Sequence, residues 1–219
     1  MNQKIEKNIH QIWCGPHPLP EKFNHKVLSW KKLNPEFNYK LWTNNELQST
    51  FPEEYKSLVG NPRIVNINTY VIASDFFRFK IVNTFGGMYF DVDLGCVTPI
   101  NEWSIPDYNF WGVKYAHCLV SASFGESSGG RITELLSDNK SFDLAKNHNF
   151  LGPEYLYSKF NEVRDLDPNW GYEETLLTSL WYPSFFGLDN KGHNTYTHDD
   201  NYHSSWYPGR VNPITDTIN

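Results

Sequence analysis

Gly86-Gly87-Met88-Tyr89-Phe90-Asp91-Val92-Asp93 is the stretch of the sequence that decides the fold. Its centre, Met88-Tyr89-Phe90, is a short apolar run typical of a buried strand. The run ends abruptly in two carboxylates, and a turn at that point lets both of them reach one ion. Carboxylate oxygens suit Mg²⁺ or Mn²⁺, which keep other coordination positions for phosphate oxygens and water. Acid pairs of this form are common by chance, so a solvated loop with two acids is the alternative.

The segments before this stretch predict alternating strands and helices. A helix is expected over Asn68–Phe85, because its apolar residues form a stripe at helical spacing and Gly86-Gly87 ends it. Upstream, the pattern predicts strands at residues 8–13 and 37–42, a helix at residues 27–33, and a further short helix capped by Thr43 or Asn44. Alternation of this kind is the opening of an α/β fold. Ligands of such folds bind beyond the carboxyl ends of the strands, where Trp13 and Asp91 are expected.

The second half of the chain has weaker signals. A strand is predicted at residues 110–113, and helices at residues 131–136 and 152–160. The tail from Gly187 to Asn219 is polar and has little periodicity, but its Tyr, His and Trp residues predict a segment that folds over a site. The whole chain of 219 residues is within the usual range for one domain.

Composition narrows the classes of function. Lys plus Arg total 19 and Asp plus Glu total 25, a formal net charge of −6. A weakly acidic chain lacks the basic face that coating a nucleic acid requires, so no nucleic-acid partner is expected. The sequence has no apolar run long enough for a transmembrane segment and no signal-peptide core at its N-terminus. Cys14, Cys96 and Cys118 form no CxxC pair, which favours free thiols and a cytoplasmic location.

The motifs around the acid pair are more specific than the pair itself. Ala73-Ser74-Asp75-Phe76-Phe77-Arg78 precedes it, Ile9-His10-Gln11-Ile12-Trp13 opens the chain, and Ser205-Trp206 follows near its end. Together they resemble glycosyltransferase family 32, whose members share a DXD-containing sugar-binding region. That family includes yeast-type α-1,6-mannosyltransferases and bacterial capsule enzymes, and the clostridial glucosylating toxins are more distant relatives. The resemblance runs from about residue 8 to residue 207 and is densest before residue 100.

The resemblance implies a fold and an activity. The expected fold is α/β and GT-A-type, a Rossmann-like nucleotide-sugar-binding domain with a mixed central sheet and helices on both faces. Residues 1–219 would form this single domain, with residues 1–100 as the nucleotide-sugar-binding half and residues 101–219 as the acceptor half and closing segment. The activity would be metal-dependent, retaining transfer of a hexose to a hydroxyl of a glycan or lipid-linked glycan. A UDP-sugar is the favoured donor, GDP-mannose is the alternative donor, and Mn²⁺ or Mg²⁺ is the expected cofactor.

The same resemblance implies roles for single residues. Trp13 would stack on the nucleobase, Asp75 would accept hydrogen bonds from ribose or sugar hydroxyls, and Arg78 would contact sugar or phosphate. Tyr89 would line the donor pocket, Asp91 would hold ribose and reach the metal, and Asp93 would be the direct metal ligand. Asp75, Arg78 and Asp93 are thus the expected catalytic residues.

The end of the chain would complete this site. Ser205 and Trp206 would close over the diphosphate, with a hydroxyl and an indole N–H as donors. The closing histidine of the family is a metal ligand, and here the spacing departs from the family pattern. His198 is favoured because Tyr196-Thr197-His198 matches the usual approach, with a small insertion after it. His203 is the alternative ligand.

Each role has a plainer alternative. Trp13 and Tyr89 could be core residues, Asp75 and Arg78 could form an exposed ion pair worth a few tenths of a kcal/mol, and Gly86-Gly87 could be a simple helix stop. For the whole chain, the alternatives are a nucleotide-sugar-binding module without catalysis and a metal-dependent nucleotide-sugar hydrolase. The products formed from a nucleotide sugar would separate these functions.

Overall fold

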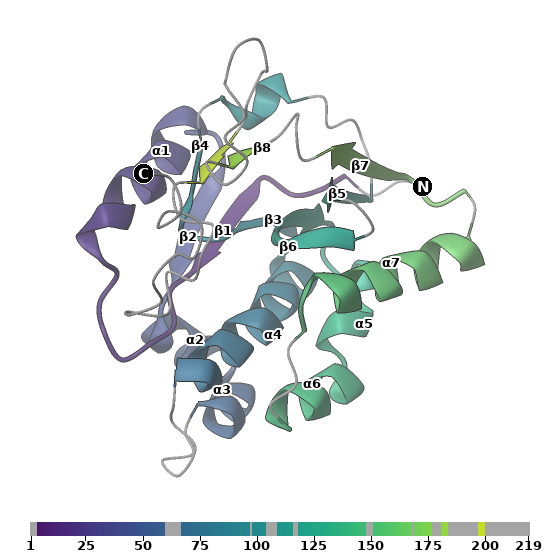
Figure 1. The fold of residues 1–219 in the computed structure, drawn as a ribbon, viewed down its shortest axis with the longest axis horizontal. Coiled ribbons are helices and arrows are strands. Elements are labelled where there is room, and N and C mark those ends of the chain that lie inside the picture. Colours follow the sequence, from purple (N-terminus) through teal and green to yellow (C-terminus); the bar gives the residue numbers. More distant parts are fainter. Residues whose placement is uncertain are drawn as a thin grey trace, which may run out of the picture.

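A mixed β-sheet forms the centre of the computed structural model, which describes residues 4–59, 67–96, 98–103, 109–115, 118–147, 151–167, 169–176, 181–183 and 197–199. In these residues the strands lie in the order β2-β1-β3-β6-β5-β7 (Figure 1). They span β1 (Asn8–Ile12), β2 (Asn38–Trp42), β3 (Gly87–Phe90), β5 (Phe110–Tyr115), β6 (Cys118–Glu126) and β7 (Tyr172–Leu176). Strand β1 is parallel to β2 and β3, β6 is antiparallel to β3 and β5, and β7 is parallel to β5.

Helices cover both faces of this sheet. One face carries α2 (Asn44–Thr50), α3 (Pro52–Leu58), α4 (Ile67–Phe85), α5 (Arg131–Ser137), α6 (Asn139–Lys146) and α7 (Pro153–Leu166). The other face carries α1 (Asn24–Leu33), which follows the short helix η1 (Glu21–Phe23), and the short helix η2 (Ile100–Glu102). Figure 1 shows α1 apart from the α2–α7 group, with the sheet between them.

The alternation of side chains along β3 explains why the sheet is buried on both faces. Met88 and Phe90 point to the α1 side, where Phe90 stacks on Trp30 with ring centroids 3.9 Å apart. Tyr89 points to the opposite side and packs in the cluster formed with α4. A strand with apolar residues on both faces requires a cover on each. The continuous apolar run of β3 is therefore what places it inside the fold.

The Gly86-Gly87 pair makes the sharp passage from α4 into β3. Both residues have left-handed backbone angles, φ +62° and φ +106°. A Cβ on Gly87 would lie 2.5 Å from the carbonyl oxygen of Asn8 in β1, so this glycine also permits the close approach of two strands. The helix stop predicted at this pair is confirmed. The backbone that passes close to Gly87 belongs to β1.

Most of the elements predicted before residue 100 are present, with shifted ends. Helix α1 begins three residues before the predicted start, and Glu46 accepts a hydrogen bond from the Thr43 backbone at 3.0 Å, so Thr43 is the cap. The pattern missed α3, α6, β6 and β7, and it ended α7 six residues early. Strand β6 was missed although its residues 120–124 alternate between apolar and small polar, the pattern of a strand.

A smaller sheet lies beside the end of β3. It contains β4 (Leu94–Cys96), β9 (Thr197–Asp199) and β8 (Trp181–Pro183), in the order β4-β9-β8. Strand β9 is antiparallel to β4, so residues 197–199 of the tail lie next to the segment that follows Asp93. These three residues of the tail thus fold back beside β4, and its role in covering a site stays a prediction.

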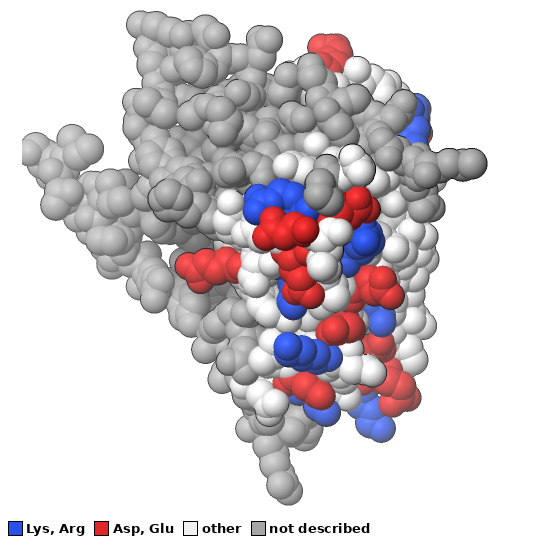
Figure 2. Space-filling model, turned by 90° about the vertical axis from the view of Figure 1, so that its right-hand side faces the viewer, with Lys and Arg blue, Asp and Glu red and all other residues white. Residues whose placement is uncertain are grey.

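The described surface beside α7 carries charges of both signs. Figure 2 shows acidic and basic side chains interspersed on this face, and three ion pairs there join Arg131 to Asp167, Lys159 to Glu162, and Arg164 to Asp165. Within the described residues, none of the helices combines the length and the apolar character that crossing a membrane requires.

Candidate functional site

The acid pair lies in a tight turn at the carboxyl end of β3. The Asp91 backbone N–H donates to the Ala122 carbonyl of β6 at 2.9 Å, and the Leu94 N–H closes the turn on the Asp91 carbonyl at 3.0 Å. The Asp91 side chain is 30% exposed, and its Oδ1 accepts a 2.6 Å hydrogen bond from the Tyr89 hydroxyl. The expected turn at the strand end is thus observed, and it brings Asp91 and Asp93 to one edge of the sheet.

Asp75 and Arg78 form a buried ion pair on α4, facing the sheet. Arg78 Nη2 lies 2.6 Å from Asp75 Oδ1, and the two side chains are 8% and 11% exposed. Arg78 Nη1 also lies 3.7 Å from Asp91 Oδ1, so the helix and the turn meet at this guanidinium. The alternative of an exposed surface pair is therefore wrong, because β6 and β3 cover this part of α4.

The environment of Asp75 sets its acidity. Burial raises the pKa of the Asp75 carboxyl to about 6, the guanidinium of Arg78 acts against that rise, and the charge of Asp91 adds to it. A carboxylate that is ionised at neutral pH in a buried place suits a group that accepts hydrogen bonds from hydroxyls.

Ser121 on β6 is a further hydrogen-bond partner of Arg78. The sequence alone did not predict this contact. Arg78 Nη1 donates to the Ser121 carbonyl at 2.8 Å and to its Oγ at 3.2 Å. Because β6 is antiparallel to β3, its first half lies beside the end of β3, where Phe90 pairs with Ser123. Only the pairing of these strands reveals Ser121, since nothing near it in the sequence resembles a site.

Trp13 lies beside the acid pair, in a small apolar cluster with Phe23 and Val92. Its side chain is mostly buried, its ring centroid lies 6.0 Å from that of Phe23, and its Nε1 donates to the His17 carbonyl at 2.8 Å. Trp13 thus packs against the residue between the two aspartates. This position allows contact with a ligand held at the turn, and it also gives the tryptophan a structural role.

His10, on β1 inside the sheet, holds the glycine turn that follows the carboxyl end of α4. The Trp42 indole N–H donates to His10 Nδ1 at 3.2 Å, so Nε2 carries the proton and donates to the Gly86 carbonyl at 2.9 Å. Burial lowers the pKa of His10 to about 4, while its hydrogen bond to Gly86 acts in the opposite direction. A neutral His10 therefore joins β1, β2 and the glycine turn.

The predicted residues from the end of the chain are only partly described. Strand β9 pairs His198 with Gly95, two residues beyond Asp93. This register brings the backbone of His198 to the site. His203, Ser205 and Trp206 lie outside the described residues.

The described part of the chain offers two carboxylates for a metal ion at this turn. No group of three His, Cys, Asp or Glu side chains there is close enough to form a complete protein-made site. Mn²⁺ and Mg²⁺ are commonly held by one or two carboxylates together with substrate phosphates and water. Asp91 and Asp93 fit such a partial site, because their oxygens are hard ligands and they lie in one turn.

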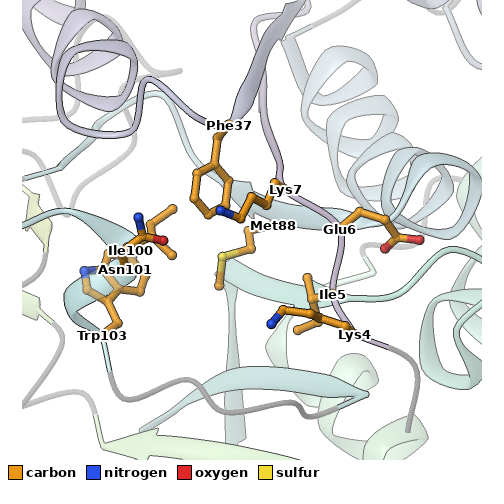
Figure 3. A pocket seen from close by; sticks show the side chains of 9 residues that line it. All are labelled: Lys4, Ile5, Glu6, Lys7, Phe37, Met88, Ile100, Asn101 and Trp103. Carbon is orange, nitrogen blue, oxygen red and sulfur yellow. The ribbon is translucent and has the colours of Figure 1, made fainter. Parts of the chain in front are cut away.

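A cavity of about 240 Å³ lies elsewhere, at the amino ends of β1 and β3. Figure 3 shows that Lys7 extends toward Phe37 and Met88, while Glu6 turns away from the cavity. The Glu6 carboxylate instead accepts the Ser128 backbone N–H at 3.1 Å. None of the predicted site residues lines this cavity, so it is separate from the site at the aspartates.

Comparison with known proteins identifies the region that contains this site. Residues 20–111 match the family described as "Glycosyltransferase sugar-binding region containing DXD motif". Residues 20–111 of this chain are thus similar to the sugar-binding region of that glycosyltransferase family. The matched region includes Asp75, Arg78, Asp91 and Asp93, and the predicted resemblance is confirmed.

Curated relatives of the sugar-binding region include a yeast enzyme. The chain is 29% identical over 102 residues to inositol phosphoceramide mannosyltransferase 1 of Schizosaccharomyces pombe. The match covers 45% of this chain and 31% of that protein. The chain therefore spans about a third of the length of this relative.

Solved structures show the same fold. The PaToxG glycosyltransferase has a TM-score of 0.55 and 21% identity, over 76% of this chain and 72% of that one. Mouse xyloside xylosyltransferase 1 has a TM-score of 0.52 and 10% identity, over 90% of this chain and 98% of that one. The predicted α/β GT-A-type fold, with a mixed sheet and helices on both faces, is confirmed.

Proposed function

We propose that this chain is a metal-dependent, retaining hexosyltransferase that uses a nucleotide diphosphate sugar as donor. One observation carries the proposal: the turn with Asp91 and Asp93 meets the buried Asp75–Arg78 pair, within a region of the DXD sugar-binding family. Carboxylates and a guanidinium at one place suit a ligand that bears both hydroxyls and a diphosphate.

The donor would lie against the carboxyl ends of β1 and β3. Trp13 stacks on the nucleobase, and Tyr89 and Asp91 line the ribose side, joined by their hydrogen bond of 2.6 Å. Asp75 accepts hydrogen bonds from sugar hydroxyls, and Arg78 places its charge near the sugar or the phosphates. Ser205 and Trp206 close over the diphosphate from the tail.

Asp93 would be the direct ligand of Mn²⁺ or Mg²⁺, with Asp91 and His198 as further ligands. When bound, the metal neutralises the negative charge that develops on the leaving diphosphate. The pairing of His198 with Gly95 supports His198 over His203 as the histidine ligand, because it brings that backbone beside the segment after Asp93.

Departure of the diphosphate is the step that the chain itself assists. The positive charge of Arg78 and the hydrogen-bond donors of Ser205 and Trp206 stabilise that group as it leaves. The acceptor hydroxyl then attacks from the face that the diphosphate vacates and passes its proton to the departing diphosphate oxygen, so the anomeric configuration is retained. The fixed ion pair with Asp75 and the hydrogen bonds to Ser121 keep Arg78 in place during this step.

The donor sugar and the acceptor are further parts of the proposal. A UDP-sugar remains the favoured donor, and the yeast relative's name as a mannosyltransferase supports testing GDP-mannose beside it. A glycan or lipid-linked glycan is the proposed acceptor, bound by residues 101–219, while residues 1–100 bind the donor. Buried free thiols at Cys14 and Cys96 support a cytoplasmic location.

The Asp93→Asn substitution tests the proposed metal ligand. We expect the variant to lose more than about 100-fold in Mn²⁺-dependent turnover, because an amide replaces the charged ligand. Turnover of UDP-glucose, UDP-galactose and GDP-mannose would be followed by release of nucleoside diphosphate, with and without Mn²⁺. Asp143→Asn, at an exposed position of α6, is the control and should keep full activity. Full activity of the Asp93→Asn enzyme would overturn the assignment.

A further inference from the structure

Three backbone carbonyls of the turn at residues 91–94 accept hydrogen bonds from side chains of other elements. Gln11 on β1 donates through Nε2 to the Asp91 carbonyl at 3.0 Å. Trp30 on α1 donates through Nε1 to the Leu94 carbonyl at 2.9 Å. Between these two bonds, the ammonium group of Lys26 on α1 donates to the carbonyl of Asp93. Two elements distant in sequence thus hold the turn that carries both aspartates.

Lys26 is the only charged group among these three donors, and it is buried. Lys26 as a whole residue is 2% exposed, and Gln11 and Trp30 are completely buried. An ammonium group taken out of water costs free energy unless hydrogen bonds and charges compensate it. Lys26 precedes Trp30 by four residues, so both lie on one face of α1 and reach successive parts of the turn. An apolar side chain would fill this position without the free-energy cost of burying a charge, so the packing of the lysine alone does not explain it.

The other two donors are themselves fixed. The Tyr39 hydroxyl donates to Gln11 Oε1 at 2.7 Å, which orients the amide so that its N–H₂ faces the Asp91 carbonyl. The Trp30 ring stacks on Phe90 and packs edge-on against Trp103, at centroid distances of 3.9 Å and 6.1 Å. These contacts leave the turn little freedom to change shape.

We propose that Lys26 is a positioning residue that, with Gln11 and Trp30, holds the turn in the shape that lets Asp91 and Asp93 bind a metal–diphosphate complex. The inference rests on the proposed function of this turn. Its physical basis is that partners which orient metal ligands typically contribute 10- to 100-fold in metal affinity. The hydrogen bond to the Asp93 carbonyl, and not the fit of an alkyl chain, is the contribution that we assign to Lys26.

Binding of Mn²⁺ in the presence of UDP, and in parallel of GDP, tests this role. Free Mn²⁺ would be measured by electron paramagnetic resonance for the wild type and for Lys26→Met, which keeps the length of the side chain but removes the donor. We expect the affinity of Lys26→Met to fall by about 10- to 100-fold. Lys32→Met, on the exposed face of the same helix, should stay within about twofold of the wild type.

Two further variants separate positioning from folding. Lys26→Gln restores an N–H donor without the charge, and it should regain part of the lost affinity. Trp30→Phe keeps an aromatic ring on Phe90 but removes the N–H that reaches Leu94, and it should weaken binding by about 10-fold. Thermal unfolding would show that each variant is folded at the temperature of the binding measurement.

The outcomes distinguish the two proposals. If the wild type binds Mn²⁺ with UDP or GDP, but Lys26→Met and Trp30→Phe bind as tightly, the positioning role is wrong and the proposed function stands. A Lys26→Gln variant as weak as Lys26→Met would also contradict a role through the hydrogen bond. If the wild type binds no Mn²⁺ with either nucleotide, the proposed function fails and the inference fails with it.

Discussion

Arg78 joins three elements through one guanidinium group. It contacts Asp75 on its own helix, Ser121 on β6 and Asp91 at the end of β3. Nη2 reaches Asp75, while Nη1 reaches both Ser121 and Asp91, and a lysine has no such pair of nitrogens in one plane. The spacing of Asp75 and Arg78 predicts their pairing, because residues three apart share a helix face. The roles of Ser121, Lys26 and Gln11 could not be predicted, since their partners are far away in the sequence.

Removing Arg78 should destabilise the protein strongly. Arg78→Met leaves the carboxylate of Asp75 buried without its partner, and we expect a loss of ~3–5 kcal/mol in the free energy of unfolding. Urea unfolding at pH 7 measures this change. Arg164→Met removes the exposed partner of Asp165 and should change stability by less than ~1 kcal/mol. Equal losses in the two variants would show that the buried pair contributes nothing beyond a surface pair.

His10 should make stability depend on pH. Its pKa is about 4 in the folded protein against an ordinary value of 6.5, so the unfolded chain binds more protons between these values. Stability is then fully present above pH 6.5 and is lost as pH falls toward 4, by ~2 kcal/mol from this group between pH 7 and pH 5. Urea unfolding at both pH values measures the loss. It should be ~2 kcal/mol smaller in His10→Asn, and unchanged in His17→Asn, which is exposed. A loss in His10→Asn as large as in the wild type would contradict a buried neutral His10.

The passage from α4 to β3 is the element on which the site depends. The helix, the glycine turn and the strand were predicted from the sequence because each has a strong local signal: helical spacing, two glycines, and a continuous apolar run. Helices α3 and α6 were missed although each has a local start signal, Pro52 in the first turn of α3 and Asp138 as the cap of α6. Strand β6 was missed although its residues 120–124 alternate between apolar and small polar. The contact of Ser121 with Arg78 could not be predicted, because it depends on the pairing of β6 with β3.

Gly87 should tolerate no side chain. In Gly87→Ala the new Cβ would meet the Asn8 backbone at 2.5 Å and would also force a left-handed conformation on alanine. Gly129 has a similar left-handed angle, φ +67°, but open space around it. We expect Gly129→Ala to cost ~1–2 kcal/mol in the free energy of unfolding and Gly87→Ala to cost clearly more. Urea unfolding compares them, and equal costs would mean that the approach of β1 and β3 has no part in the requirement for glycine.

The described residues form an α/β fold, and the structure describes more of its first 100 residues than of the tail after residue 176. The GT-A-type fold was predicted from the resemblance of its motifs to a known family, and two of them, Trp13 and the acid pair, lie just beyond the ends of β1 and β3, where such folds bind ligands. The contribution of the tail was predicted from its aromatic residues, and β9 is the part of it that the structure places, beside β4. What the proposed acceptor half, residues 101–219, binds could not be predicted, since binding loops follow no local pattern.

The central claim is that this chain transfers a sugar from a nucleotide diphosphate donor with the help of a metal ion. The most direct measurement is the identification by mass spectrometry of the products formed from UDP-sugars and GDP-mannose with Mn²⁺ and a panel of glycan and glycolipid acceptors. The account predicts nucleoside diphosphate together with an extended acceptor or, without acceptor, free sugar formed slowly, and neither product when a chelator removes the metal. Nucleoside monophosphate and sugar phosphate as products, or an unchanged yield in the chelator, would contradict it.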